Sequence, residues 1–256
     1  MLKKLLLEIA RCEEVEKVSL DKKSPCKEIV KSQGLGKEDS YLPEPWRGHL
    51  GTARILFVSS NPGFSMESDA PTNRWKKGES ITDYFENSFS GGKKEWIKDA
   101  LYPLLKNGEY KKDHVRYWAA VRKIACELLG KDKKNIRPGE DYALTEVVHC
   151  KSESEKKGGV EEVQPECVKR YLGRILEISG ARVVVCSGDE ARKAVEKHLD
   201  IPESPDRIHY DKNRKRYFIF MPHLTGFWGP RKFKTVVDPK IDPKKIEEMR
   251  KALFTK

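Results

Sequence analysis

Short apolar runs alternate along the chain with longer stretches that carry apolar residues at helical spacing. The apolar runs predict buried β-strands at residues 54–59, 143–148, 181–186 and 217–220. The longer stretches predict helices at residues 2–18, 79–129, 165–178, 188–198 and 243–253. Residues 208–210 predict a short strand that pairs with the last run across a turn. Because strands alternate with helices, we expect an α/β protein with a three-layer αβα fold, in which helices cover both faces of a central, mostly parallel, four-stranded sheet.

The chain shows no linker and no internal repeat, so its 256 residues predict a single domain. We expect an N-terminal helix with an irregular extension (1–50), a core (51–235) and a C-terminal helix (236–256). The hydrophobic share of 38%, with 5 Trp, 9 Tyr and 9 Phe, suffices for a core and excludes whole-chain disorder. No apolar run approaches the roughly 18 residues of a membrane span, and Glu8 and Arg11 interrupt the apolar N-terminus, so we expect a cytoplasmic protein with no membrane partner.

The charge balance points to a polyanionic partner. The 51 Lys and Arg residues against 40 Asp and Glu residues give a formal net charge of +11. An excess of this size is typical of proteins that bind nucleic acid. The alternative is a lysine-rich surface whose charges are simply solvated, as suits solubility or heat.

Two polar segments follow predicted strands at the edge where parallel sheets bind their ligands. After the first strand, Pro62 restricts Asn61 to an extended conformation, and Gly63 lets a ligand come close. An amide fixed in this way can orient a water molecule. After the last strand, His223 can donate a hydrogen bond to a developing anion or exchange a proton. Asn61 and His223 are therefore the candidate catalytic pair.

These segments, in this order, resemble the uracil-DNA glycosylase superfamily. Residues 59–63, Ser-Ser-Asn-Pro-Gly, resemble its first motif, G-x-N-P-G, and residues 223–225, His-Leu-Thr, are similar to its last, H-P-S. Residues 145–151 resemble the strand T-N-V-V-K-C-R of the thermophilic iron–sulfur branch, and residues 162–172 resemble the helix that follows it. Residues 181–191 resemble the next strand–glycine–helix unit, so the similarity covers roughly residues 50–230.

The resemblance implies a monofunctional DNA glycosylase of base-excision repair, which hydrolyses the N-glycosidic bond of uracil or another damaged base flipped out of DNA. Asn61 would position the attacking water, and neutral His223 would donate to the base oxygen as negative charge builds there. No metal is needed for that step. Tyr84 and Phe85 compete with Phe64 as the aromatic that stacks on the base. The implied base-binding residues are Ser60, Gly63, Phe64, Glu146 and Thr225.

Glu146 departs from the family pattern, which has Asn at this place on the uracil edge. An amide both donates and accepts, whereas an ionised carboxylate only accepts. Ionised Glu146 would repel O4 of uracil while accepting from N3–H, and a base with an exocyclic amine would suit it better. Uracil is the substrate that the resemblance implies, and another modified or deaminated base is the alternative. The structural alternative for Glu146 is a salt-bridged strand end.

Aromatic and basic residues alternate in residues 226–234, directly after the last motif. This pattern suits a loop that inserts a wedge into the base stack and grips the flanking phosphates, as the family does with this segment. The alternative is a Trp packed on the domain beside solvated lysines. The expected DNA contacts are Phe227, Trp228, Arg231, Lys232 and Lys234.

Six cysteines in a cytosolic chain favour buried thiols or metal ligands over disulfides. Cys150 and Cys167 resemble, with one extra intervening residue, the second pair of ligands of the [4Fe–4S] cluster in the iron–sulfur branch. Cys12 and Cys26 are the candidates for the first pair, although the family has that pair as a close C-x-x-C. Four thiolates are what such a structural cluster requires. Zinc accepts the same ligands and is the next candidate, and the remaining alternative is that all six cysteines are reduced and buried.

Two other functions compete with the glycosylase. The first is a non-catalytic, nucleic-acid-binding relative of the same fold, which the altered motif residues Ser59, Leu224 and Glu146 favour. The second is a small-nucleotide enzyme that uses the same sheet edge, but the chain has no G-x-G-x-x-G or Walker-type loop. With the glycosylase we expect a monomer in a prokaryotic cytoplasm whose partner is damaged DNA.

Overall fold

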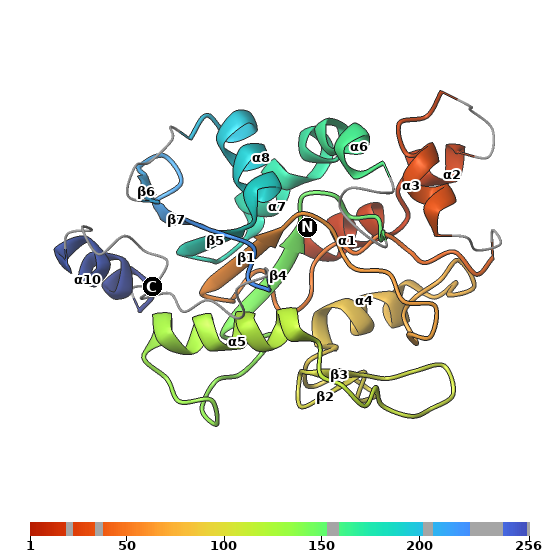
Figure 1. Cartoon of the computed structure of the whole chain (residues 1–256), viewed down its shortest axis with the longest axis horizontal. Coiled ribbons are helices and arrows are strands. Elements are labelled where there is room, and N and C mark those ends of the chain that lie inside the picture. The colour runs from red at the N-terminus through yellow and green to blue at the C-terminus, as the bar shows by residue number, and fades with distance from the viewer. Residues whose placement is uncertain (19–22, 34–37, 153–158, 202–206, 226–242, 255–256) are drawn as a thin grey trace.

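A five-stranded sheet forms the centre of the computed structural model, which describes residues 1–18, 23–33, 38–152, 159–201, 207–225 and 243–254 (Figure 1). Across the sheet the order of the strands is β4 (Tyr142–Glu146), β1 (Ile55–Ser59), β5 (Val183–Ser187), β7 (Arg216–Met221) and β6 (Ile208–Asp211). The first four strands run parallel, and β6 pairs antiparallel with β7. The mostly parallel sheet is confirmed. The four-stranded count is wrong, because residues 208–211 join the sheet as a full edge strand.

Helices cover both faces of this sheet, which explains the continuous apolar runs of its strands. On one face, Leu56 and Val58 pack among α1 (Leu2–Ala10), α4 (Gly78–Asn87) and α8 (Asp189–Leu199). On the other face, Ile55 and Phe57 meet α5 (Arg116–Leu129) and α10 (Pro243–Ala252). Figure 1 shows α7 and α8 on one side of the sheet and α5 on the other. The remaining helices and the small hairpin are α2 (Glu13–Lys17), α3 (Lys27–Ser32), β2 (Ile97–Lys98), β3 (Tyr102–Pro103), α6 (Val160–Cys167), the π-helical turn η1 (Val168–Leu172) and α7 (Gly173–Ile178).

The helical stretches differ from the prediction in three places. The predicted helix 2–18 is broken at Arg11, whose guanidinium donates to the carbonyl of Trp75 at 2.6 Å. The predicted helix 79–129 is two helices separated by the β2–β3 hairpin, because three glycines and one proline interrupt residues 88–115. The helix predicted from Pro165 begins earlier, at Val160, and a π-helical turn follows the proline. Within the described ranges, no helix is long and apolar enough to cross a bilayer.

The N-terminal segment covers the open edge of the sheet. Arg47 exchanges backbone hydrogen bonds with Leu144 of β4, at 2.8 and 3.0 Å, and the N–H of Glu44 donates to the carbonyl of His149 at 2.8 Å. An uncovered edge strand would offer unpaired backbone groups to other chains. This pairing also brings two charged side chains, Glu44 and Arg47, to the carboxyl end of β4.

Candidate active site

The register of the sheet brings the two predicted catalytic segments to the same edge. Val58 of β1 pairs with Cys186 of β5, and Cys186 pairs with Phe220 of β7. Asn61 and His223 each lie three residues beyond these aligned positions. Only β5 separates their strands, so two strand spacings, about 10 Å, lie between the strand axes. This spacing leaves room for a small planar ligand between residues that extend beyond the two strand ends.

Asn61 is held in place by the segment that follows β4. Its Nδ2 donates to the hydroxyl of Ser152 at 2.8 Å and to the carbonyl of Pro62 at 3.1 Å. The backbone fixes the same contact, since Phe64 N–H donates to the Ser152 carbonyl and Ser152 N–H donates to the Pro62 carbonyl. Within the described part of the chain, no group donates to Asn61 Oδ1. The amide is therefore oriented by its nitrogen, and its oxygen can accept from a water molecule.

His223 is held in one tautomer by the residue two positions on. The backbone N–H of Thr225 donates to His223 Nδ1 at 3.3 Å, and the Thr225 hydroxyl lies 3.2 Å from the same atom. Since a backbone N–H only donates, Nδ1 accepts, and the proton of the neutral ring resides on Nε2. The ring also lies beside Tyr117 of α5, with 6.2 Å between the ring centroids. A neutral His223 can therefore offer an Nε2–H donor.

Gly188 supports His223 from the end of β5. Its φ of 94° and ψ of 160° lie in a region that only glycine occupies readily, and its N–H donates to the Met221 carbonyl at 2.9 Å. A Cβ at this position would lie 3.6 Å from His223 Cδ2, an ordinary contact, so a substitution acts mainly through the backbone.

Gly188→Ala is expected to lower the free energy of unfolding by about 1–3 kcal/mol, because alanine resists this backbone conformation. The measurement is urea denaturation. Gly173→Ala is the matched control, since Gly173 lies inside α7 and a Cβ there would meet nothing within 4 Å. If the two variants unfold at the same urea concentration, the strain assigned to Gly188 is wrong.

Buried charges gather at the carboxyl end of β4. The Glu44 carboxylate accepts from Arg47 Nη2 at 2.7 Å and Nε at 3.0 Å, and it also accepts from the Lys151 ammonium. The guanidinium of Arg47 also donates to the hydroxyl of Tyr84 at 3.3 Å. Although burial opposes ionisation, the two cations lower the pKa of Glu44 to about 2. Sequence analysis missed this cluster, since no motif joins residue 44 to residue 151.

Glu146 lies beside this cluster without joining it. Its side chain is buried, with 8% of the residue exposed, and no described residue donates a hydrogen bond to its carboxyl group or pairs with it in a salt bridge. Burial first, and then the charge of Glu44, raises the pKa of Glu146 to about 8. Among the described residues, Glu146 therefore forms no salt bridge, and its raised pKa favours the protonated carboxyl group at neutral pH.

The other predicted base-binding residues lie around the same edge. The hydroxyl of Ser60 is buried, and no described residue bonds to it. Gly63 bridges to Ser152, and a Cβ on it would meet nothing within 4 Å. Phe64 is partly exposed and packs edge-on against Tyr41, with 5.8 Å between ring centroids. Its competitors Tyr84 and Phe85 are buried in the core against each other, which leaves Phe64 as the more accessible ring.

Sequence analysis also missed polar groups that the sheet brings to this edge. The hydroxyl of Ser187, at the end of β5, is fully buried and has no hydrogen-bond partner in the described ranges. A strand-end serine was visible in the sequence, but its burial between β1 and β7 was not. Thr225, by contrast, was predicted, and it acts on His223 rather than standing free.

The four predicted ligand cysteines lie in one buried region on the α1 side of the sheet. Burial, followed by the charges of the other three thiols, raises the pKa of Cys150 far above its usual value. Burial and Cys12 likewise raise the pKa of Cys26 to about 12, and the pKa of Cys167 rises to about 12 through burial and then Cys26 and Cys12. Such mutual effects require the thiols to be close together. Even so, no group of three or more His, Cys, Asp or Glu side chains among the described residues has the arrangement of a metal site.

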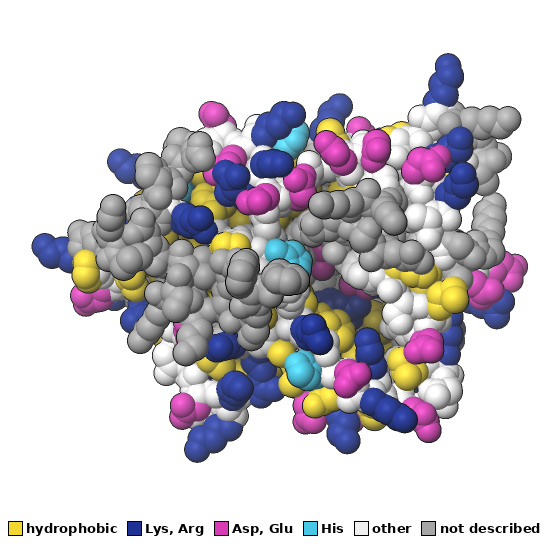
Figure 2. All heavy atoms as spheres, viewed as in Figure 1, with side chains coloured by type: hydrophobic (Ala, Val, Ile, Leu, Met, Phe, Trp, Pro, Cys, Tyr) yellow, Lys and Arg dark blue, Asp and Glu magenta, His cyan; other side chains and the backbone are white. Residues whose placement is uncertain are grey.

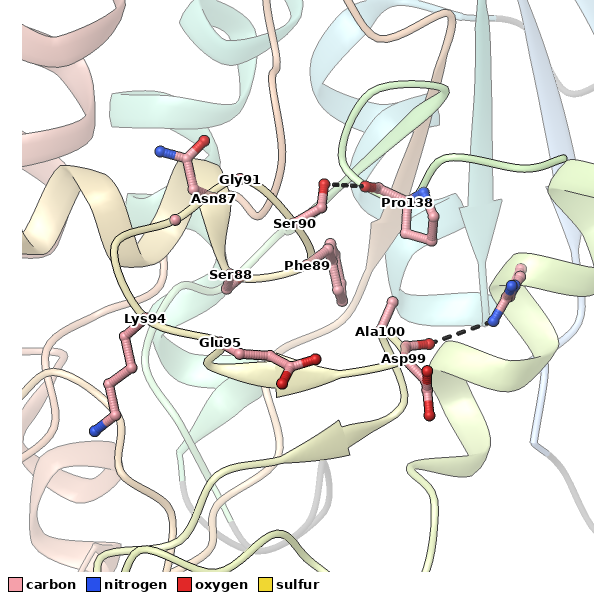
Figure 3. Close-up of a pocket in the computed structure, with 12 residues that line it drawn as sticks. Asn87, Ser88, Phe89, Ser90, Gly91, Lys94, Glu95, Asp99, Ala100 and Pro138 are labelled. Carbon is pink, nitrogen blue, oxygen red and sulfur yellow. Dashed lines mark hydrogen bonds between the residues drawn. The ribbon is translucent and has the colours of Figure 1, made fainter. Parts of the chain in front are cut away.

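Two pockets of the described structure lie away from the catalytic pair. The first, of about 420 Å³, lies between the loop after α4 and the residues around Asp99 (Figure 3). Figure 3 shows Phe89 in its wall and the Ser90 hydroxyl bonded to the Pro138 carbonyl. The second, of about 310 Å³, lies against Trp75 and Trp96. Neither Asn61 nor His223 lines either of them.

The charge excess does not form a single patch on the face in Figure 2, where Lys and Arg side chains are interleaved with Asp and Glu. The predicted wedge residues Phe227, Trp228, Arg231, Lys232 and Lys234 lie outside the described residues. No protein-family model matches the sequence, and no curated protein matches it either. The function therefore has to be argued from the site.

Proposed function

We propose that the protein is a monofunctional DNA glycosylase with the fold of the uracil-DNA glycosylase superfamily, which removes uracil or another deaminated base flipped out of DNA. One observation carries the proposal. The Asn61 amide is fixed by its nitrogen, and no described group donates to its oxygen; the His223 ring accepts at Nδ1, which places the proton of the neutral ring on Nε2. Both stand beyond the carboxyl ends of β1 and β7, at the same level of the sheet.

The proposed reaction is a hydrolysis at the anomeric carbon of the flipped nucleotide. Asn61 Oδ1 accepts a hydrogen bond from a water and aims its oxygen at C1′. As the C1′–N bond breaks, its electron pair moves into the base, and His223 Nε2–H donates to the base oxygen where the charge gathers. The water oxygen bonds to C1′ and its proton leaves to the released base or to solvent. The products are a free base and an abasic sugar, and neither strand is cut.

We also propose that Cys12, Cys26, Cys150 and Cys167 would hold a structural [4Fe–4S] cluster, with zinc as the alternative. The donors are of the right chemical kind, because four buried thiols act on one another and a thiolate-held group would stabilise their ionised forms, but the described side chains do not have the arrangement of a metal site. These cysteines come from α1–α2, α3, the end of β4 and α6, so a cluster would tie the N-terminal helices to the sheet. It supplies no chemistry to the hydrolysis.

Protein purified without oxygen is expected to be brown, to absorb near about 400 nm and to contain about four irons per chain. Cys150→Ser is expected to lose the colour and the iron. Cys126→Ser is the control and is expected to keep both, because Cys126 lies on α5, across the sheet from the four. A colourless, iron-free protein would contradict the cluster, and tightly bound zinc in that protein would favour the alternative ion.

A non-catalytic, DNA-binding relative is the second candidate, favoured by Ser59 and Leu224 in the two motifs. Both candidates bind DNA with an affinity that falls as salt rises. A panel of duplexes, each with one deaminated or modified base, separates them. Formation of abasic sites on at least one duplex supports the glycosylase. Binding to every duplex without base loss supports the relative.

A further inference from the structure

Resting on the proposed function, we propose that Glu146 reads the flipped base as a neutral carboxylic acid, so that the protonated enzyme excises bases with a lactam edge and the ionised enzyme rejects them. A lactam edge is a carbonyl oxygen beside a ring N–H, as in uracil, hypoxanthine and xanthine. Deamination of an exocyclic amine creates this edge.

The position of Glu146 supports the proposal first. Glu146 is the last residue of β4 and pairs with Ser59 of β1. It alternates with Tyr142 and Leu144, which belong to the core on the α5 side of the sheet. His223 meets Tyr117 of α5, so it lies toward the same side. Three strand spacings, about 14 Å, separate β4 from β7. Glu146 and His223 therefore lie toward the same face of the sheet, at the carboxyl ends of strands three positions apart.

The unused hydrogen-bonding capacity of Glu146 is the second support. More than nine-tenths of this residue is buried, yet no described residue donates to its carboxyl group. Both nearby cations donate to Glu44 rather than to Glu146. A largely buried carboxyl group that lacks a described partner is poorly solvated, and a ligand that supplies hydrogen bonds to it is stabilised there.

The charges that face Glu146 are those of Glu44, Arg47 and Lys151. Arg47 and Lys151 favour ionisation of Glu146, whereas burial and the carboxylate of Glu44 oppose it more strongly. The resulting pKa of about 8 keeps the carboxyl group protonated at neutral pH.

The chemistry of the two protonation states then decides which edge is bound. A carboxylic acid holds an O–H donor and a carbonyl acceptor side by side, so it donates to a lactam oxygen and accepts from the adjacent N–H. A carboxylate holds two acceptors, and one of them faces the lactam oxygen without a proton between them. Like an amide, the neutral acid can therefore donate to the lactam oxygen and accept from the adjacent N–H. The ionised carboxylate can only accept.

The test is the rate of base excision under single-turnover conditions between about pH 6 and pH 9.5, on duplexes that carry one uracil or one hypoxanthine. The wild-type rate is expected to fall about tenfold from pH 7 to pH 9, as a group with a pKa of about 8 requires. Glu146→Gln is expected to remove this fall, because an amide keeps its donor at every pH. Glu109→Gln, which changes an exposed carboxylate, is the control and keeps the fall.

Infrared difference spectra of the wild type provide a readout that does not depend on catalysis. The carbonyl band of one neutral acid should disappear as the pH rises through about 8, and this change should be absent in Glu146→Gln. A flat wild-type rate, or the same alkaline fall in Glu146→Gln, overturns the neutral-acid proposal while the glycosylase stands. If no base is released from any duplex at any pH, the proposed function fails, and this inference fails with it.

Discussion

Asn61→Ala is expected to slow base release by about 10²- to 10³-fold, and His223→Ala by a similar factor. The first change removes the amide oxygen that orients the water, and the second removes the Nε2–H that stabilises the departing base. Loss of one such preorganised group typically costs a factor of this size. Asn61 also anchors Ser152 through its Nδ2, so the alanine variant loses this tether as well.

Single-turnover excision from a duplex with one deaminated base measures both effects. Asn107→Ala and His209→Ala are the matched controls, because Asn107 is exposed in a turn and His209 lies on the edge strand β6. Both controls are expected to react at the wild-type rate. If Asn61→Ala and His223→Ala react at rates within threefold of the wild-type rate, neither residue takes part in the reaction.

Glu44→Ala is expected to lower the free energy of unfolding by about 3–5 kcal/mol, because it leaves Arg47 and Lys151 buried without their shared carboxylate. The pH dependence follows from the direction of the shift. Since the folded pKa of about 2 lies below the usual 4.5, ionised Glu44 stabilises the fold above about pH 4.5, and this contribution is lost as the pH falls toward 2. The same removal of charge should lower the pKa of Glu146.

Urea denaturation at neutral and acid pH measures this effect, and Glu13→Ala is the control. Glu13 forms an exposed pair with Lys17, and such pairs contribute little. At neutral pH the Glu44 variant should unfold at much lower urea than the wild type, and the difference should shrink on acidification. If both variants unfold at the same urea concentration as the wild type at neutral pH, the buried cluster does not stabilise the fold.

The sheet was largely predictable, because strands buried on both faces need unbroken apolar runs. The run predicted at 54–59 corresponds to β1 at Ile55–Ser59. Asn61 therefore follows a strand end, as predicted. The stretch 79–129 was not predictable in the same way. Trp96 and Leu104 fit a helical spacing, but they belong to the β2–β3 hairpin region, where three glycines and Pro103 outweigh the pattern.

The protonation state of Glu146 could not be predicted from sequence, since it depends on groups that only the fold brings together. Glu44 is about a hundred residues away along the chain, and it reaches this edge through backbone pairing with β4. Sequence analysis identified the departure from the family amide but assigned it the charge of an isolated carboxylate. Burial and a charged neighbour reverse that assignment. In the proposed site, the neutral acid would supply the donor that the family amide provides.

The most direct test of the central claim is chromatographic and mass-spectrometric detection of free base after excess protein meets a duplex with a single uracil or hypoxanthine. The proposed site predicts one molecule of free base for each abasic sugar, with both strands intact and with no release by Asn61→Ala above the background. Prolonged incubation that leaves every base attached, although the protein binds the duplex, would contradict it.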